Sequence, residues 1–421
     1  MSGGQSQERA SGQSQERAPG QSQERASGQS QGPASGHSQE PASATGQASG
    51  ARSSEHALAT RAVHAGLTPD PTYRSVIPAI HQTSTYAQQA PGRFVEDYDY
   101  SRSANPTRAA LEAALGELEG GMAVAFSSGL AAEHALITAV CSAGAHIVLP
   151  DDLYGGTFRL VSRVMSRWGL AHDLVRQTDL DALARAIRDD TALVWVESPT
   201  NPMLNVIDIP GVVARRAGAL VAVDNTFATP VNQRPLELGA DFVVHSTTKY
   251  LGGHSDVVGG AVVTRHRDWY ERLRFVQNSI GAVPGPFDCF LVHRGLRTLH
   301  LRMQAHARSA AAVVELLRSA PEVSDVRWPG FSGMVSFRHP RAAEVASATR
   351  LFTLAESLGG VESLIEVPAA MTHQSVAGSD AAVPADLVRL SCGVEEPADL
   401  VADLRAALSA RAAGGEASAG A

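Results

Sequence analysis

The feature of this sequence that most constrains its fold is a regular alternation of helical patterns with short apolar runs, from residue 109 to about residue 264. The apolar runs cover residues 122–126, 146–149, 192–196, 220–223, 242–244 and 261–263. Runs this short, separated by helices of about a dozen residues, are typical of strands that are buried on both faces of a parallel sheet. The pattern therefore predicts a three-layer α/β domain with a mostly parallel sheet and right-handed crossovers.

Polar residues collect where these strands are expected to end. They are Ser127 and Ser128, Asp151 and Tyr154, Glu197 to Asn201, Asp224 to Thr226, and Ser246 to Lys249. In open α/β sheets, ligands bind beyond the carboxyl ends of the strands. We therefore expect one site, built from several loops at one edge of the sheet.

The same patterns divide the chain into five parts. Residues 109–295 are expected to form the large domain, and residues 296–410, with Pro-bounded short strands and helices, a smaller α+β domain that meets the first over the site. Residues 56–108 resemble an extended arm that contacts a neighbouring subunit. Residues 1–55 hold five copies of an eight-residue Gly-, Gln- and Ser-rich unit and lack Val, Ile, Leu, Phe, Trp, Tyr and Cys, which predicts a disordered tail. Residues 411–421 are expected to be a second disordered tail.

Composition excludes several classes of partner. Acidic residues outnumber basic ones 43 to 35, and the net charge of -8 disfavours an extended surface for nucleic acid or anionic membranes. The sequence has no membrane-length apolar run and no apolar N-terminal signal, so we expect a cytoplasmic protein that acts on small molecules. Cys141, Cys289 and Cys392 lack metal-binding spacing, so we expect buried thiols and no metal.

One residue count is more informative than the rest: of the 35 basic residues, 34 are arginine and only Lys249 is lysine. A lysine amine can lose its proton and act as a Schiff-base nucleophile, which an arginine cannot. A lysine that merely survived compositional drift is the alternative, and the neighbours of Lys249 argue against it. Ser246, Thr247 and Thr248 offer hydroxyls that could hold a phosphate without pairing with the amine. Asp224 ends another predicted strand and supplies the carboxylate that a pyridoxal phosphate ring nitrogen requires, although alone it could be a turn acid.

Two further segments fit a phosphate group. The segment FSSGLAAEHA, residues 126–135, predicts a strand, a Ser-Ser-Gly turn and a helix whose N-terminus attracts anions. Ordinary helix capping would explain this turn equally well. In YSRSANPTR, residues 100–108, Tyr100 and Arg102 could reach one phosphate, and an exposed loop is the alternative.

Together these motifs resemble the Cys/Met-metabolism PLP enzymes, the transsulfuration group. The resemblance rests on HSTTKYLGGHSDVVGG, VDNTFATP, YSRSANPTR, FSSGLAA, YGGTFR, ESPTNP, ESLGGVESLIEVPAAMTH and VRLSCGVEE, which occur in the family's order over about residues 57–409. Within the family, the chain is most similar to cystathionine γ-synthases and γ-lyases. The resemblance implies the PLP-dependent transferase fold type I, which is aspartate aminotransferase-like, with pyridoxal 5′-phosphate as cofactor. It also implies a homo-oligomer with shared active sites, a homotetramer in the family's usual form.

The resemblance also implies a role for each matching position. Lys249 would form the Schiff base with the cofactor and move protons, and Tyr154 would stack on the cofactor ring and assist at the leaving group. The implied cofactor-binding residues are Tyr100 and Arg102 from the neighbouring subunit, with Gly129, Leu130, Tyr154, Asp224, Thr226, Ser246, Thr248 and Lys249. The implied substrate-binding residues are Asn201, Ser363 and Arg389 around the α-carboxylate and a cofactor oxygen, Glu362 at a distal ammonium, and Arg159.

The implied reaction is γ-replacement, which joins O-acyl-homoserine and cysteine into cystathionine, or γ-elimination, which splits cystathionine into cysteine, 2-oxobutanoate and ammonia. The alternatives are a methionine γ-lyase, a homocysteine-forming sulfhydrylase, a paralogue for a related γ-substituted amino acid, and a non-catalytic member. Gly156, where a methionine γ-lyase is expected to carry Cys, favours the cystathionine enzymes. The chain departs from the family pattern at Ala104, Leu130 and Val367, and residues 328–334 are shortened, which affects packing, substrate range or assembly.

Overall fold

The computed structural model describes residues 56–96, 98–374, 378 and 382–410. The two predicted tails, residues 1–55 and 411–421, lie outside the described residues. In the part of the chain that is described, no helix combines the length and the apolar character needed to cross a membrane.

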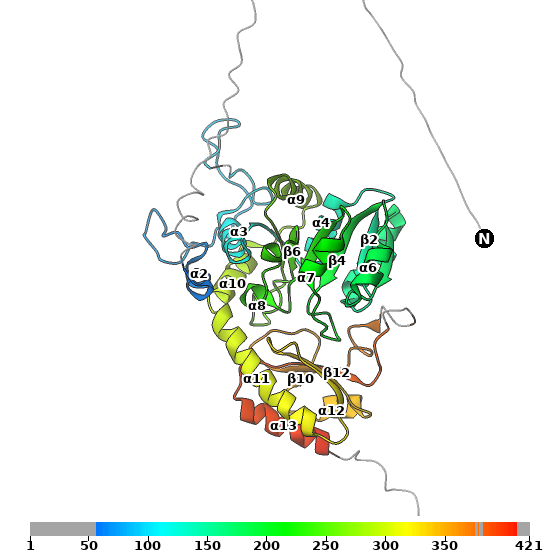
Figure 1. Cartoon of the computed structure of the whole chain (residues 1–421). Coiled ribbons are helices and arrows are strands. Elements are labelled where there is room, and N and C mark those ends of the chain that lie inside the picture. The colour runs from blue at the N-terminus through cyan, green and yellow to red at the C-terminus, as the bar shows by residue number, and fades with distance from the viewer. Residues whose placement is uncertain (1–55, 97, 375–377, 379–381, 411–421) are drawn as a thin grey trace, which may run out of the picture. The chain divides into compact units, whose positions relative to one another are not determined.

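The larger sheet has seven strands in the order β1-β7-β6-β5-β4-β2-β3 (Figure 1). They are β1 (Met122–Phe126), β2 (His146–Pro150), β3 (Ala171–Val175), β4 (Thr191–Glu197), β5 (Leu220–Asp224), β6 (Phe242–His245) and β7 (Gly260–Thr264). The neighbouring pairs among β2 to β6 are parallel, and β7 is antiparallel to both β6 and β1. The observed sheet is therefore mostly parallel, as the apolar runs predict.

Helices bury both faces of this sheet. In β5, Ala222 packs in the core shared with α4 (Gly129–Val140) and α9 (Arg267–Ile280). Val221 and Val223, which point to the other face, pack in the core shared with α6 (Leu180–Ala186) and α7 (Ile209–Arg215). Alternating side chains of one strand thus enter two cores, which explains why the strands are apolar at nearly every position.

The smaller sheet has five strands in the order β10-β11-β12-β9-β8. They are β8 (Ser324–Arg327), β9 (Met334–Arg338), β10 (Thr353–Leu354), β11 (Leu364–Glu366) and β12 (Leu387–Ser391). The helices beside it are α12 (Ala342–Ala348) and α13 (Pro397–Ser409). Pairing is antiparallel except between β10 and β11.

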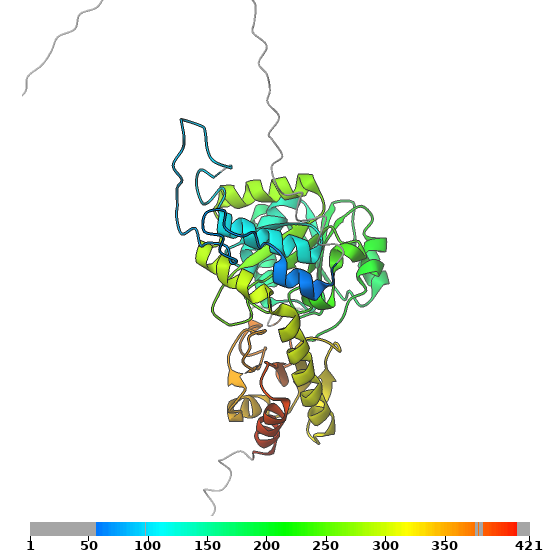
Figure 2. The ribbon, with the colours of Figure 1, turned by 90° about the vertical axis from the view of Figure 1, so that its left-hand side faces the viewer.

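A long helix, α11 (Leu299–Ser319), joins the two sheets (Figure 2). Leu299 and Met303, near its start, pack in a core of the larger sheet. Val313 and Leu317, near its end, pack beneath the smaller sheet. Because one continuous helix takes part in both cores, it fixes the smaller sheet over one edge of the larger one.

The remaining elements are short or belong to the N-terminal region. They are α2 (Leu58–His64), α3 (Pro106–Glu119), α5 (Gly155–Arg159), a π-helical turn (Leu160–Val164), 3₁₀ turns (Met165–Trp168 and Pro235–Leu238), α8 (Thr229–Asn232) and α10 (Pro286–Leu296). Between α2 and α3 the described chain has only isolated bridges, such as Thr85 with Tyr100. Tyr73 and Val76 in this segment expose 86% and 72% of their surface, which is unusual for large apolar side chains outside an interface.

Candidate active site

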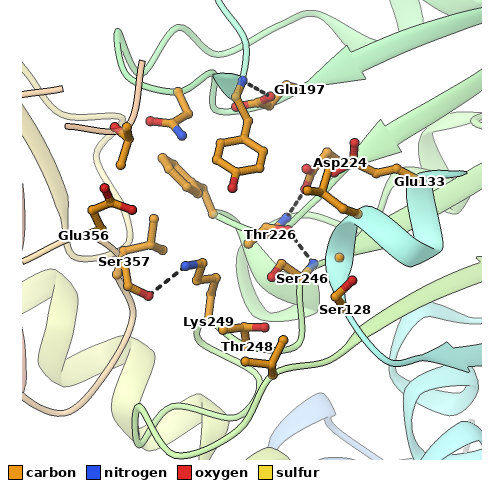
Figure 3. A pocket seen from close by; sticks show the side chains of 18 of the residues that line it. Ser128, Glu133, Glu197, Asp224, Thr226, Ser246, Thr248, Lys249, Glu356 and Ser357 are labelled. Carbon is orange, nitrogen blue, oxygen red and sulfur yellow. Dashed lines mark hydrogen bonds between the residues drawn. The ribbon is translucent and has the colours of Figure 1, made fainter. Parts of the chain in front are cut away.

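Side chains from several strand ends meet in one cavity of about 300 Å³. Asp224 and Glu197 end β5 and β4, and Ser128 and Ser246 follow β1 and β6. The segment from Glu356 to Leu358 contributes the opposite wall (Figure 3). The lining includes the predicted residues Gly129, Leu130, Tyr154, Asn201, Asp224, Thr226, Ser246, Thr248, Lys249 and Arg389. The carboxyl edge of the sheet and the smaller sheet therefore build this cavity together.

The amine of Lys249 points across the cavity to the opposite wall. Lys249 follows β6, and its backbone N–H donates to the Ser246 carbonyl at 3.2 Å, in a tight turn. Its Nζ donates a hydrogen bond to Ser357 Oγ at 2.7 Å (Figure 3). Burial, and next the charge of Arg389, lower the pKa of Lys249 from 10.5 to about 8. A substantial fraction of this amine is therefore neutral, and able to act as a nucleophile, near neutral pH.

Asp224 is a buried acid that its neighbours hold in place. Its Oδ1 accepts a hydrogen bond from the Thr226 backbone N–H at 2.9 Å, and the Thr226 hydroxyl accepts one from the Ser246 backbone N–H at 2.9 Å. Burial raises the pKa of Asp224, while the hydrogen bonds from Thr226 and the nearby His245 oppose that shift. The strand end thus presents an oriented carboxyl to the cavity.

An anion cradle forms where α4 begins. Ser128 caps the helix by accepting a hydrogen bond from the Ala131 backbone N–H at 3.0 Å, and the first-turn amides of Gly129 and Leu130 lie at the cavity wall. A Cβ at Gly129 would lie only 2.9 Å from the Cβ of Ser246, so Ser246 packs against the start of the helix too closely to allow a side chain at position 129. Bare amides, a helix dipole and neutral hydroxyls make a site for an anion such as a phosphate.

Arg389 is a preorganised cation on β12. Its guanidinium donates to Asn201 Oδ1 at 2.8 Å and to the Ser357 carbonyl at 3.0 Å, and it forms an ion pair with Glu366 at 3.0 Å. Glu366 lies directly across from Arg389 in the register of β11 and β12. Since the side chain of Arg389 is 3% exposed and its Nε has no hydrogen-bond partner among the described residues, one donor remains for a ligand.

Tyr154 precedes α5 and lines the cavity beside Glu197. The Tyr154 backbone N–H donates to Glu197 Oε2 at 2.9 Å, and burial raises the pKa of the phenol. A Cβ at Gly156 would lie 2.3 Å from a ring carbon of Tyr154. The ring therefore occupies the space that a side chain at position 156 would need.

Three predicted substrate residues, Glu362, Ser363 and Arg159, are not among the described residues that line the cavity. Ser363 is fully buried elsewhere, where its Oγ donates to Glu395 Oε2 at 2.9 Å and accepts from the Gly393 backbone N–H at 2.8 Å. Glu362 accepts a hydrogen bond from Ser255. Glu362 is held by a residue of the loop between β6 and β7, and Ser363 by residues that follow β12, and neither lines the cavity. Arg159, at the end of α5, is exposed to solvent.

Glu356 and Ser357 line the cavity, whereas Glu362 and Ser363 do not. The sequence contains the tripeptide Glu-Ser-Leu twice, at residues 356–358 and 362–364, and the sequence prediction chose the second copy. The repeated tripeptide could have revealed this alternative, because the family motif can be aligned equally well with either copy. Ser357 has φ +98°, a backbone conformation that serine rarely adopts, and this places it against Lys249.

Tyr100 and Arg102 lie at a different hollow, of about 400 Å³, lined by the N-terminal segment and residues 283–286. Arg102 donates to the Asn278 carbonyl at 2.7 Å, and its guanidinium lies 5.7 Å from the centre of the Tyr100 ring. The structure therefore does not bring these two residues to the cavity of their own chain.

Two buried acids, Glu133 and Glu197, also line the cavity. The sequence places Glu197 among the strand-end polar residues without assigning it a role, and it does not point to Glu133. Burial, and next the charge of Asp224, raise the pKa of both, that of Glu133 to about 8. Glu197 ends a predicted strand and was recognisable as a strand-end acid. Glu133 gave no signal, because a glutamate in the second turn of a helix is ordinarily exposed.

Comparison with known proteins matches nearly the whole described chain. A family model described as Cys/Met metabolism PLP-dependent enzyme matches residues 59–409. A cystathionine gamma-synthase of Mycobacterium bovis is 52% identical over 373 residues, which are 83% of this chain and 96% of that protein. A cystathionine beta-lyase of Lactococcus lactis subsp. cremoris is 46% identical and covers 84% of this chain and 99% of that protein. The crystal structure of metB from Corynebacterium glutamicum has a TM-score of 0.84 at 46% identity and covers 85% and 98% of the two chains.

Proposed function

The chain belongs to the Cys/Met metabolism PLP-dependent enzyme family, and from that premise we propose that it is a transsulfuration enzyme whose cavity binds pyridoxal 5′-phosphate and a γ-substituted amino acid. The family, the fold class and the enzyme class that the motifs predict are thereby confirmed. One observation carries the assignment to this cavity. The only lysine of the chain lies there with a lowered pKa, its Nζ 2.7 Å from Ser357 Oγ.

The residues of the cavity fit the cofactor. Lys249 would bond to its aldehyde carbon, and the Asp224 carboxylate would face its ring nitrogen. The amides of Gly129 and Leu130 and the hydroxyl of Ser246 would hold the phosphate, in the cradle that leaves no room for a Cβ at position 129. The hydroxyl of Thr248, tied to Gly259, borders the same cradle. When bound, the cofactor supplies an electron sink that stabilises negative charge on substrate carbons.

The guanidinium of Arg389 would bind the α-carboxylate of the substrate, with the side chains of Asn201 and Ser357 beside it. Arg389 is held by Glu366 and Asn201, and its Nε has no hydrogen-bond partner among the described residues, so the guanidinium is already oriented before the substrate binds. Ser357 borders both Arg389 and Lys249. This placement would leave the rest of the amino acid within reach of the Lys249 amine, which moves protons between adjacent substrate carbons.

Glu356 takes the role proposed from sequence for Glu362. It lines the cavity and is exposed to solvent, so it lies at the entrance of the cavity. A carboxylate at the mouth would attract a distal ammonium, such as the second amino group of cystathionine. Tyr154, partly buried beside Glu197, would stack on the cofactor ring and pass a proton to the leaving group.

We favour γ-replacement, the formation of cystathionine from O-acyl-homoserine and cysteine. The 52% identity to a cystathionine gamma-synthase over nearly its full length supports this reaction. Cleavage of cystathionine is the second candidate, supported by the 46% identity to a cystathionine beta-lyase. Both reactions use the same carboxylate and ammonium contacts, and the fate of the substrate carbons after proton removal distinguishes them.

A second copy of the chain would complete the site. Of the described residues that line the cavity, only Lys249 and Arg389 are cations, and Arg389 is already paired with Glu366. Arg102 and Tyr100 from a neighbouring subunit would supply a cation and a hydroxyl to the phosphate. The exposed apolar residues between α2 and α3 support an assembly, which we propose to be a homotetramer with shared sites. The three free cysteines fit a reducing compartment such as the cytoplasm.

A cofactor and substrate panel tests the proposal. Purified protein should gain a visible absorption band with pyridoxal phosphate, and borohydride should then fix the cofactor to Lys249, as peptide mass mapping can show. Lys249→Ala and Lys249→Arg should both lose the band and the turnover, because arginine keeps the charge but not the nucleophile. Turnover is then measured with O-acyl-homoserine plus cysteine and, separately, with cystathionine. Absence of any cofactor band, or activity above a few per cent in Lys249→Arg, would refute the assignment.

A further inference from the structure

The cavity contains an acid to which the proposed reaction assigns no role. Glu133 lies in the second turn of α4, the helix whose first turn forms the anion cradle. Its side chain lines the cavity although the residue is only 3% exposed, and its Oε2 has no hydrogen-bond partner among the described residues. A buried carboxyl oxygen without a partner is costly, so we expect this oxygen to carry a proton that it can donate or to accept one from a neighbour.

The charged and titratable groups nearest to Glu133 are acids. Asp224 of β5 lies next to it (Figure 3), and Glu197 of β4 and the Tyr154 phenol share the same wall. None of the ion pairs among the described residues includes Glu133. Burial, and next the charge of Asp224, raise the pKa of Glu133 to about 8, against the opposing Thr157 hydroxyl. When two buried carboxyls lie close together, the negative charge of one raises the pKa of the other and favours a single shared proton.

We propose that Glu133 is a second acid of the ring-nitrogen subsite, a neutral carboxyl that donates its proton in a hydrogen bond to the ionised Asp224 carboxylate. The inference rests on the proposed function, since it concerns the place where the cofactor ring would lie. One proton and one negative charge are then shared by two carboxyls. Asp224 keeps the charge that the ring nitrogen requires, and Glu133 fixes the direction in which that charge points. Glu133 is therefore a positioning residue that acts through Asp224.

Cofactor affinity tests this arrangement in the full chain. The dissociation constant of pyridoxal phosphate is measured at pH 7 by absorbance titration of the cofactor-free protein, its Glu133→Gln and Glu133→Ala variants, and Glu112→Gln. Glu112 is a partly buried acid of α3 outside the cavity, so its variant controls for the loss of a carboxyl from the interior of the protein. Glu133→Ala should weaken binding at least tenfold, the loss of about one charge-assisted hydrogen bond. Glu133→Gln keeps a donor of similar reach and should weaken binding by less than about threefold.

Two results would overturn the proposal. Equal weakening in Glu133→Gln and Glu133→Ala would mean that a charged carboxylate is required, and unchanged affinity in Glu133→Ala would mean that the acid does not act on the subsite. If wild-type protein does not bind the cofactor at all, the proposed function fails instead.

Infrared spectroscopy gives a second, independent readout that needs no bound cofactor. A protonated carboxyl has a carbonyl stretch that is separate from the carboxylate bands. The difference between cofactor-free wild type and Glu133→Gln at pH 7 should show the loss of one protonated carboxyl. Loss of a carboxylate band in its place would overturn the proposal even if the alanine variant fails to fold.

Discussion

The amine of Lys249 should react with small electrophiles at a pH where ordinary lysines are inert. Burial and Arg389 lower its pKa from 10.5 to about 8, although the negative charges of Glu366 and Glu356 oppose the shift. At pH 7, an ordinary lysine has about one neutral amine in 3,000, whereas a pKa of about 8 leaves about one in ten neutral. Because only the neutral amine is nucleophilic, the expected gain in reactivity at pH 7 is about 300-fold.

The composition of the chain makes this measurement unusually clean. Cofactor-free protein is treated with cyanate, a small reagent that carbamylates neutral amines, at pH values from 6 to 11. Mass spectrometry of peptides then separates Lys249 from the N-terminal α-amine, since the chain has no other lysine. The rate at Lys249 should rise tenfold per pH unit below pH 8 and level off above it. A rate that continues to rise tenfold per unit through pH 10 would refute the lowered pKa.

A matched pair of variants tests the cause of the shift. Glu356→Gln removes a negative charge that favours the ammonium form, so the plateau should begin at a lower pH. Glu362→Gln makes the same change in the second Glu-Ser-Leu tripeptide, outside the cavity, and should leave the pH profile of the Lys249 reaction unchanged. A shift of equal size in both variants would contradict the placement of Glu356 beside the amine.

Three further predictions concern residues in the cavity and beside it. Glu356→Gln should lower kcat/KM for cystathionine about five- to tenfold more than for substrates without a distal ammonium, because it removes a solvent-exposed charged contact. Glu362→Gln should affect both kinds of substrate equally. Equal effects of Glu356→Gln on both kinds of substrate in a steady-state assay would contradict this assignment. Gly156→Ala places a Cβ 2.3 Å from the Tyr154 ring, so kcat should fall at least tenfold with little change in Tm, and full activity would show that the ring position is unimportant. Ser363→Ala leaves the buried Gly393 backbone N–H and a partly buried Glu395 carboxylate oxygen without this partner. It should reduce the free energy of unfolding in urea by about 1–3 kcal/mol, while the remaining folded protein keeps its kcat. A loss of kcat without a loss of stability would return Ser363 to the site.

The strands of the larger sheet were predictable because each packs against helices on two faces. The predicted runs at residues 122–126 and 220–223 lie within β1 and β5, with bounds that agree to one residue. The strand β3 was missed for the opposite reason. It lies at the edge of the sheet, and its residues Ala171–Val175 alternate between exposed and partly buried, so they form no apolar run.

Helix limits were predictable where a proline or a glycine marks them. The sequence predicts a final helix over residues 397–409, and α13 (Pro397–Ser409) has these bounds because proline is favoured in a first helical turn. The sequence also predicts a helical region around residues 292–319, which the structure interrupts between Leu296 and Leu299. At Gly295 a Cβ would lie 2.3 Å from the Gly252 carbonyl oxygen, so this end of α10 presses directly on the loop after Lys249. Such a contact between distant segments leaves no local trace in the pattern.

The lone lysine could be found by counting, but its chemistry could not, because the groups that set it come from the far end of the chain. Ser357, which accepts the hydrogen bond from Lys249, follows it by 108 residues, and Arg389 and Glu366 come from strands of the second sheet. Ser357 reaches the amine only in a backbone conformation that its own sequence disfavours, at φ +98°. The packing of the smaller sheet over the edge of the larger one must therefore impose that conformation. The identity of the nucleophile is thus set by one residue of the sequence, whereas the pKa of its amine is set by residues that the packing of the two sheets brings next to it.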